Sequence, residues 1–202
     1  MTREPFTAGP IRTEPATRHN APVQRIAIVG SPGSGKTTLA RELAGRLDLT
    51  HIEIDAIFHQ PGWEPLPDDQ FIARITQATS ADRWVSDGNY QRVARPIIWQ
   101  RADTVVFLDL PKRTVMHSLL KRSVRRSWRQ EELWNGNKER FRNFVKPDKE
   151  DNILLWAWTQ YDRYRVDYLT HMEDPQYARL DFVQLRSRRE IAEWVAEARG
   201  SR

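Results

Sequence analysis

The feature that most limits the fold of this chain is one glycine-rich segment, Gly30-Ser31-Pro32-Gly33-Ser34-Gly35-Lys36-Thr37. It fits the pattern G-x-x-x-x-G-K-[ST], follows an apolar run at 26–29 and leads into a stretch with helical spacing of apolar residues. Glycines let successive backbone N–H groups point at one anion, and the positive end of the following helix adds to the attraction. A strand, such a loop and a helix in this order predict an α/β fold that binds phosphate groups of a nucleotide.

Each fixed position of this phosphate loop has a role in that chemistry. Lys36 supplies a mobile positive charge for the β- and γ-phosphates of ATP, and the hydroxyl of Thr37 is a ligand for Mg²⁺. ATP and Mg²⁺ are therefore the predicted cofactors. The residues predicted to surround the phosphates are Gly30, Ser31, Pro32, Gly33, Ser34, Gly35, Lys36, Thr37 and Thr38.

Length and composition exclude several classes of protein. The chain has 202 residues, enough for one α/β domain, and it has no cysteine, which excludes disulfides and thiolate metal sites. It has no apolar run near the ~20 residues that span a bilayer, and its N-terminus does not look like a secretion signal. We expect a cytoplasmic protein without a membrane partner. Residues 1–22 are rich in proline and predict a disordered tail, which leaves 23–202 as the domain.

Strand and helix patterns alternate along this domain. Strands are predicted at 24–29, 51–54, 84–86, 104–110 and 179–185, and helices at 36–47, 68–78, 91–100, 112–127, 151–172 and 188–199. This alternation predicts a parallel sheet with helices on both faces. A turn at 135–137 lies within a predicted short lid at about 128–150.

A carboxylate follows the third predicted strand. Asp87 precedes Gly88 at the carboxyl end of that strand, where open parallel sheets place their ligands. Asp87 is predicted to hold Mg²⁺ opposite Thr37. The alternative is a simple Asp-Gly turn. Asp109 ends another apolar strand, and we expect it to cap or orient the next helix.

The positive charge is concentrated in one segment. The chain carries a net charge of +5, while 112–146 contains eleven lysines and arginines and three glutamates, a net charge of +8. Arg122, Arg125 or Arg126, and Arg129 are spaced to share one helix face. Arginines that close over a moving phosphoryl group stabilise its charge, so Arg122, Arg125 and Arg126 are candidate catalytic residues. The alternative is a solvated basic face.

The side of the site that would hold the acceptor is less defined by the sequence. Asp55 ends the second predicted strand and is a candidate for binding or deprotonating an acceptor hydroxyl, with helix capping as the alternative. His59 is expected to be a polar loop residue, and Trp63 either lines the acceptor pocket or packs the loop. Arg92 and Arg95 are candidates for holding an acceptor phosphate.

The tryptophans within and after the basic segment could have either of two roles. Trp128 and Trp134 could stack on nucleic-acid bases, but we expect them to anchor the lid on the core. Trp156 and Trp158 are expected to pack the long helix at 151–172.

The order of these motifs resembles the adenylate-kinase-like branch of small P-loop kinases. Narrower segments are similar to the adenylate-kinase-related group called DNA topology modulation proteins, over roughly 24–185. The segments that carry this likeness are the phosphate loop, 55–63, Asp87-Gly88-Asn89-Tyr90, 101–104 and Leu133-Trp134-Asn135-Gly136-Asn137. The resemblance implies a three-layer P-loop fold, a five-stranded sheet of order 2-3-1-4-5 and a short lid that opens with the arginine-rich run.

The resemblance also implies a reaction, the transfer of the ATP γ-phosphate to a small acceptor. The chain departs from adenylate kinases at Gln91, where those enzymes carry arginine, and it has no evident nucleoside-monophosphate site after the second strand. The expected function is an ATP- and Mg²⁺-dependent phosphotransferase acting on a nucleoside, nucleotide or other hydroxyl compound. The alternatives are a nucleotide-gated ATPase that binds nucleic acid through 112–146, which is the less favoured partner, and an ATPase without an acceptor.

Overall fold

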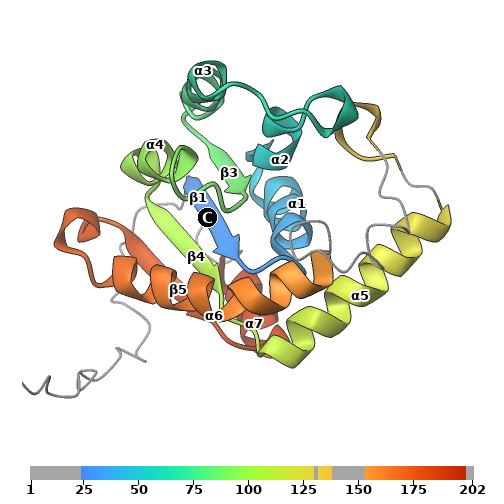
Figure 1. Ribbon diagram of the computed structural model, residues 1–202. Coiled ribbons are helices and arrows are strands. Elements are labelled where there is room, and N and C mark those ends of the chain that lie inside the picture. Colours follow the sequence, from blue (N-terminus) through green and yellow to red (C-terminus); the bar gives the residue numbers. More distant parts are fainter. Residues whose placement is uncertain (1–23, 130–131, 138–152, 199–202) are drawn as a thin grey trace, which may run out of the picture.

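Five parallel strands form one sheet of order β2-β3-β1-β4-β5, as predicted (Figure 1). The computed structural model describes residues 24–129, 132–137 and 153–198. The predicted tail and most of the predicted lid lie outside these ranges. The strands are β1 Arg25–Gly30, β2 Thr50–Glu53, β3 Trp84–Asp87, β4 Thr104–Leu108 and β5 Asp181–Leu185.

Helices connect the strands and cover both faces of the sheet. The α-helices are α1 Lys36–Leu47, α2 Ile54–Phe58, α3 Asp68–Ala78, α4 Ala94–Arg101, α5 Lys112–Arg129, α6 Ile153–Met172 and α7 Arg188–Ala198. The short 3₁₀ turns are η1 Pro61–Trp63, η2 Trp134–Gly136 and η4 Pro175–Tyr177. No helix among the described residues is both long enough and apolar enough to cross a membrane.

The alternation of side chains along the strands divides the core into two layers. On one face, Ala27 and Val29 of β1 pack in a cluster with residues of α3, α4 and α6. On the other face, Ile26 and Ile28 pack with Leu43 of α1 and residues of α7. Burial on both faces explains why the central strands β1 and β4 are near-continuous apolar runs rather than alternating ones.

Helix α1 continues directly from the phosphate loop because its apolar residues fall on one side. Leu39, Ala40 and Leu43 are buried against the sheet, at the spacing of an amphipathic helix. The helix ends at Asp48, whose backbone adopts the left-handed conformation and whose N–H donates to the carbonyl of Ala44. The helix therefore holds Lys36 and Thr37 at its first turn, beside the sheet edge where ligands bind.

Three predicted boundaries or roles are corrected by the structure. Asp55 lies in the first turn of α2 rather than at the end of a strand, because β2 ends at Glu53. Helix α4 begins at Ala94, after a turn, rather than at residue 91. Asp109 does not cap α5; its carboxylate accepts hydrogen bonds from Arg165 of α6 and Gln184 of β5, and it ties these two elements together.

Candidate active site

A cleft of about 1150 Å³ lies beside the phosphate loop at the carboxyl edge of the sheet. Its walls come from α1, α2 and the turn after it, the segment after β3, the second half of α5, η2, and α6. The predicted residues Pro32, Gly33, Gly35, Lys36, Thr37, Thr38, Asp55, Arg122, Arg125 and Arg126 all line it. The structure thus brings together most of the residues that the sequence singled out.

The phosphate loop has the backbone shape that its glycines predict. Gly33 has a φ of 88°, and a β-carbon there would lie 2.7 Å from the carbonyl oxygen of Val115 in α5. Gly35 has a φ of 101° and sits at the N-terminal end of α1. Ser31 and Ser34 are buried beneath the loop. Only glycine fits at Gly33, because both the left-handed backbone and the close approach of α5 exclude a side chain.

Lys36 folds back over the loop. Its ammonium group donates to the carbonyl oxygens of Gly30, at 2.8 Å, and Ser31, at 3.2 Å. Burial lowers the pKa of Lys36 to about 8, against the opposing effect of the Asp55 and Asp87 carboxylates, while Arg122 lowers it further. Both carboxylates and Arg122 therefore act on this one lysine.

Thr37 of the cleft is paired with the buried Asp87. The Thr37 hydroxyl donates to Oδ2 of Asp87 at 2.5 Å, which joins the first turn of α1 to the end of β3. Nε2 of His51, on the neighbouring strand β2, donates to Oδ1 of the same carboxylate at 2.8 Å. Asp87 is 3% exposed, so its two oxygens are held from opposite sides.

This pair has the chemistry that Mg²⁺ requires. Mg²⁺ prefers hard oxygen ligands, keeps several waters and binds through one or two protein groups together with substrate phosphates. A hydroxyl and a carboxylate that touch each other beside a phosphate loop fit that pattern. No group of three or more histidine or acidic side chains that could hold a metal ion occurs in the described part of the chain. An ion at this site would therefore depend on the nucleotide for its remaining ligands.

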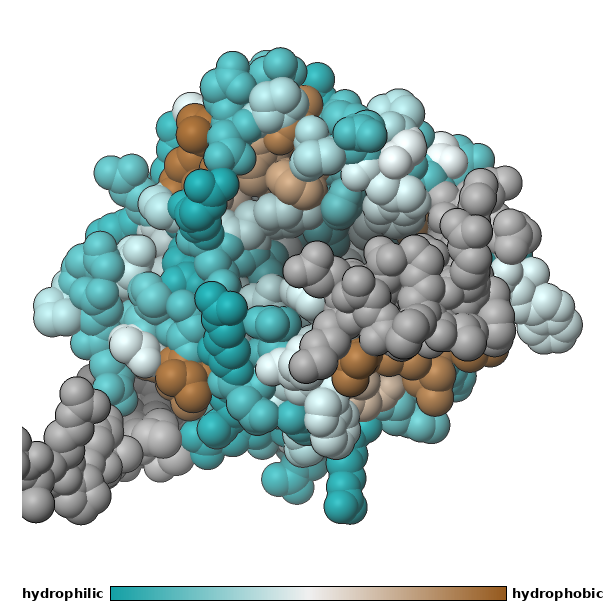
Figure 2. Space-filling view, in the orientation of Figure 1, coloured by the Kyte–Doolittle hydropathy of each residue, from teal (hydrophilic) through white to brown (hydrophobic). Residues whose placement is uncertain are grey.

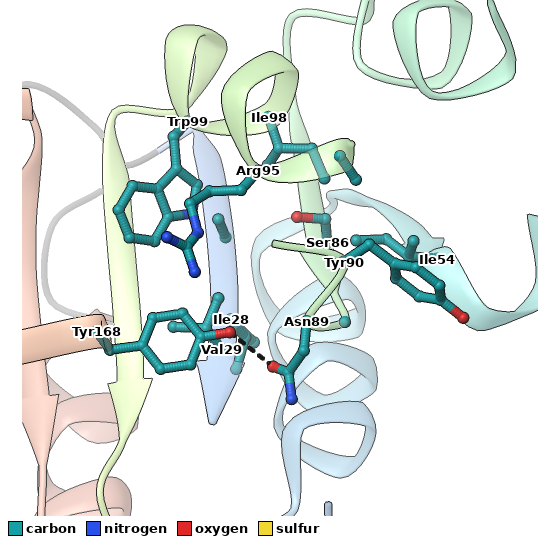
Figure 3. A pocket seen from close by; sticks show the side chains of 13 residues that line it. Ile28, Val29, Ile54, Ser86, Asn89, Tyr90, Arg95, Ile98, Trp99 and Tyr168 are labelled. Atoms are coloured by element: carbon teal, nitrogen blue, oxygen red, sulfur yellow. Dashed lines mark hydrogen bonds between the residues drawn. The ribbon is translucent and has the colours of Figure 1, made fainter. Parts of the chain in front are cut away.

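Asn89 links the segment after β3 to Gly30 of β1 and to α6. Its amide nitrogen donates to the Gly30 carbonyl at 2.8 Å, and its amide oxygen accepts from the Gly30 N–H at 3.3 Å. The same oxygen accepts from the hydroxyl of Tyr168 in α6 at 3.0 Å (Figure 3). Sequence reasoning gave no role to Asn89 or to His51, because a single amide or imidazole has no periodic signal.

The arginines of α5 differ in exposure. Arg122 and Arg126, one turn apart, are half-buried, whereas Arg125 is exposed. Ser123 and Ser127, which follow Arg122 and Arg126, are buried. All three arginines line the cleft. The helix therefore turns Arg122 and Arg126 inward, a distinction that the sequence register left open.

Asp55, in the first turn of α2, is held by Tyr90. The Tyr90 hydroxyl donates to Oδ1 of Asp55 at 2.7 Å, and it lies 3.5 Å from Nε2 of His59. Burial, together with the Asp55 carboxylate, raises the pKa of Tyr90, so the phenol keeps its proton. Burial lowers the pKa of His59 below its usual 6.5, with Asp55 opposing the change. Asp55 thus sits as a fixed carboxylate between two neutral rings.

Arg95 does not have the role that the sequence suggested. It is 8% exposed, it pairs with Asp167 of α6, and its guanidinium lies over the rings of Trp99 and Tyr168 at 5.2 and 5.3 Å. Figure 3 shows Arg95 among these rings, while Tyr90 points the other way. Arg95 is therefore part of the α4–α6 packing and cannot hold an acceptor phosphate.

Arg92 reaches the cleft wall, but its charge is already matched. Its guanidinium pairs with Asp68 of α3 at 2.8 Å, and its side chain is 83% exposed. Gln91, the position at which the chain departs from adenylate kinases, donates to Asp167 of α6 at 3.0 Å. Arg92 is thus paired with Asp68, and Gln91 is bonded to Asp167. Neither side chain forms an arginine clamp for an acceptor phosphate.

A segment that follows α5 docks on the turn after α2. Asn137 donates to the Gln60 carbonyl at 2.9 Å and accepts from the Trp63 N–H at 3.0 Å. Asn135 donates to the His59 carbonyl at 2.5 Å. Trp134 stacks on His59 with ring centroids 5.8 Å apart. Trp134 thus anchors this segment, as expected.

The other tryptophans divide between expected and corrected positions. Trp128 is 86% exposed and anchors nothing among the described residues, against expectation. Trp63 lines the cleft. Trp156 also lines the cleft and does not only pack its helix. Its ring contacts Tyr164, which lies about two turns further along α6. Trp158 is 50% exposed and lies over Lys112 at 4.4 Å.

Arg188 is a cleft residue that the sequence did not reveal. It is the first residue of α7, and its guanidinium lies 2.8 Å from the position of a β-carbon at Gly35. It also contacts the hydroxyl of Ser118 in α5 at 3.5 Å. A cation from the C-terminal end of the chain therefore lies directly against the phosphate loop.

A family model described as "ATPase family associated with various cellular activities (AAA)" matches residues 26–109. This range runs from β1 to the end of β4 and contains the phosphate loop and Asp87. The match and the fold agree on a nucleotide-binding P-loop arrangement in this part of the chain. A search of curated proteins finds no significant match.

Two solved structures illustrate the overall likeness. One is a gluconokinase from Sinorhizobium meliloti, with 20% identity over 89% of this chain and 91% of that one, and a TM-score of 0.49. The other is a shikimate kinase from Acinetobacter baumannii in complex with shikimate, with 17% identity over 87% of this chain and 90% of that one, and a TM-score of 0.49. Neither likeness bears on the acceptor of this chain.

Proposed function

We propose that this chain is a Mg²⁺-dependent phosphotransferase that moves the γ-phosphate of ATP to a hydroxyl of a small molecule. The observation that carries the proposal is the content of one cleft. The phosphate loop, the Asp55–Tyr90 pair and the arginines of α5 line the same space, and Asp87 is bonded to the cleft residue Thr37. The Asp55 carboxylate is also close enough to Lys36 to oppose the lowering of its pKa.

Each residue has a stated role in the proposal. Lys36 and the loop backbone bind the β- and γ-phosphates, and Thr37 and Asp87 hold Mg²⁺, which neutralises charge on those phosphates. Arg122 and Arg126 stabilise the negative charge of the moving group, with Arg125 beside them. Asp55 orients the acceptor hydroxyl and receives its proton.

The test is a screen of nucleosides, nucleotides, sugars and small acids for compounds that speed ADP release. An acceptor should raise ADP release with one phosphorylated product per ADP, and both should vanish in Lys36→Ala. Asp55→Asn should lose acceptor-dependent turnover and keep ATP affinity. If ATP turnover survives Lys36→Ala unchanged, the proposal is wrong. ADP release that no acceptor alters would instead identify an ATPase without an acceptor.

A second candidate function is a nucleotide-gated regulator that binds nucleic acid. Trp128 is 86% exposed on α5, close in the helix to Arg125 and Arg129. Exposed aromatic rings among arginines are typical of surfaces that stack bases. Figure 2 also shows apolar side chains along α5, where Leu120 and Val124 are 47% and 45% exposed. Tight, sequence-independent DNA binding that weakens steeply with salt would favour this function.

A further inference from the structure

Part of the cleft lining is built from aromatic rings. The rings come from α2, η1, α3, the segment after β3, η2 and α6. They are Phe58, His59, Trp63, Phe71, Tyr90, Trp134, Trp156 and Tyr164. Elements that are far apart in sequence thus contribute the same chemical group to one space.

These rings touch one another and still leave surface open to the cleft. Trp134 lies edge-on to Trp63 at 6.2 Å, and His59 meets Trp63 at 5.2 Å. On the opposite wall, Trp156 meets Tyr164 at 6.0 Å. Trp63 is 37% exposed, and Trp134, Trp156 and Tyr164 are half-buried. Ring surface that protein packing does not cover is available to a flat ligand.

The cations beside the aromatic rings are few and paired. Among the described residues that line the cleft, Arg92 is the one cation on a segment that also carries these rings, and it pairs with Asp68 at 2.8 Å. The other cations that line the cleft lie on α1, α5 and α7, and Arg41 of α1 pairs with Glu53 at 3.3 Å. An acceptor that lies against the rings would therefore meet the Asp55 carboxylate and a paired arginine, surroundings that do not favour a phosphate or carboxylate on the acceptor.

Asp55 supplies the one polar anchor that a hydroxyl needs. Tyr90 holds its Oδ1, and His59 next to Tyr90 is uncharged near neutral pH because burial lowers its pKa. A hydroxyl that donates to Asp55 would place the remainder of its molecule against the rings. Uncharged aromatic compounds stack well in such a site, since every aromatic ring has a π face.

We infer that the acceptor is an uncharged aromatic hydroxyl compound, such as a nucleoside or a hydroxylated aryl alcohol, without a phosphate or carboxylate of its own. This inference rests on the proposed kinase function and names its substrate class. In the reaction, the acceptor oxygen bonds to the γ-phosphorus, the bond from that phosphorus to the β–γ bridging oxygen breaks, and ADP leaves with the electron pair. The hydroxyl proton passes to Asp55.

The test compares acceptors by calorimetry on the full chain saturated with Mg²⁺ and a non-hydrolysable ATP analogue. The aromatic probes are cytidine, guanosine and tyrosol, and the comparison probes are CMP, galacturonate and glucose. At least one aromatic probe should bind about ten-fold more tightly than any comparison probe. The inference is overturned if CMP, galacturonate or glucose binds as tightly as the best aromatic probe, or if no aromatic probe binds.

Single-residue variants test whether the aromatic rings of the cleft bind the probe. Trp134→Ala should weaken binding of the best aromatic probe by about ten-fold, as expected for the loss of one stacking partner, and Trp134→Phe should restore most of it. The matched control is Trp128→Ala, which removes an exposed ring outside the cleft and should leave binding unchanged. Equal losses in Trp134→Ala and Trp128→Ala would overturn the assignment, and the Phe variant guards against a folding defect.

The same probes, incubated with ATP in place of the analogue, separate this inference from the kinase proposal. Aromatic probes that bind tightly but never acquire phosphate from ATP contradict the kinase proposal and leave the inference about the ring pocket in place. Phosphate transfer to CMP or galacturonate, without transfer to any aromatic probe, supports the kinase proposal and overturns the inference.

Discussion

At the scale of single residues, the proposed Mg²⁺ site depends on how Asp87 is held. Its two carboxylate oxygens accept from Thr37 and His51, so the side chain has one orientation at the end of β3. His51 would act through Asp87 rather than on the nucleotide itself. Groups that orient metal ligands typically contribute 10- to 100-fold to metal affinity or activity.

The first prediction concerns His51. His51→Ala should raise the Mg²⁺ concentration needed for half-maximal turnover by about ten-fold or more, with little change in nucleotide affinity without metal. His51→Gln, which keeps a donor, should recover part of the loss. Binding of Mn²⁺ in the presence of ADP, followed by electron paramagnetic resonance, gives a readout independent of activity. An unchanged metal affinity in His51→Ala would contradict this role.

The second prediction concerns His59, a half-buried residue close to Asp55 and Tyr90. Burial lowers its pKa in the folded state below the 6.5 expected when unfolded. Below pH 6.5 the unfolded chain binds more protons than the folded one, so this group makes stability fall as pH drops toward the folded-state pKa. His59→Gln should show a smaller loss of stability between pH 7.5 and about 5 in urea titrations. The matched control, His117→Gln on the exposed side of α5, should follow the wild type.

At the scale of elements, α5 and the segment after it determine how the cleft is covered. The helix packs against the phosphate loop at Gly33 and turns Arg122 and Arg126 inward. The segment at 133–137 then docks on the turn after α2 through Asn135 and Asn137. One continuous stretch of chain therefore contacts both the nucleotide end and the acceptor end.

The third prediction separates the arginines of α5 by their exposure. Arg126→Ala should lower kcat by about 10²- to 10³-fold, with a smaller effect on the ATP affinity, because its half-buried side chain lines the cleft and is proposed to stabilise the moving phosphoryl group. Arg125→Ala should have a weaker effect. Arg129→Ala, an exposed residue that does not line the cleft, serves as the control. Similar losses in Arg125→Ala and Arg126→Ala would contradict the inward role of Arg126.

The fourth prediction concerns the docking of the segment at 133–137. Asn137 is 4% exposed and makes two hydrogen bonds to the turn after α2. Asn137→Ala should lower the free energy of unfolding by about 1–3 kcal/mol, because two hydrogen bonds are lost while the Trp63 N–H and the Gln60 carbonyl keep the bond to each other. Amide hydrogen exchange at Trp63 should become faster in this variant. The exposed Gln100→Ala change should alter neither quantity, and unchanged exchange at Trp63 in Asn137→Ala would contradict the docking.

At the scale of the whole molecule, the sequence predicted the framework and the nucleotide end of the cleft. Apolar runs alternating with helical patterns are local signals, and the phosphate loop fixes which strand lies centrally. The convergence of Thr37 and Asp87 could be predicted because the carboxyl ends of parallel strands meet at one edge. The strand order came from the resemblance to small P-loop kinases, and the structure confirms it.

The acceptor end could not be predicted in the same way, because its contacts join residues that are distant in sequence. Arg95 appeared available for a phosphate until the structure showed its pair on α6, 72 residues away. Asn137 meets Gln60 across 77 residues, and Arg188 reaches the phosphate loop from α7. Such pairings depend on how α6, α7 and the segment after α5 pack, and no local sequence pattern predicts that packing.

The proposed reaction in this cleft transfers a phosphoryl group to a hydroxyl rather than to water. The decisive experiment follows the radiolabelled γ-phosphate of ATP in the presence of Mg²⁺ and the acceptor panel. Label should appear on one organic product with the wild-type chain, and on none with Lys36→Ala or Asp55→Asn. Label that appears only as inorganic phosphate, whatever acceptor is present, would show that water is the acceptor and would contradict the proposed transfer.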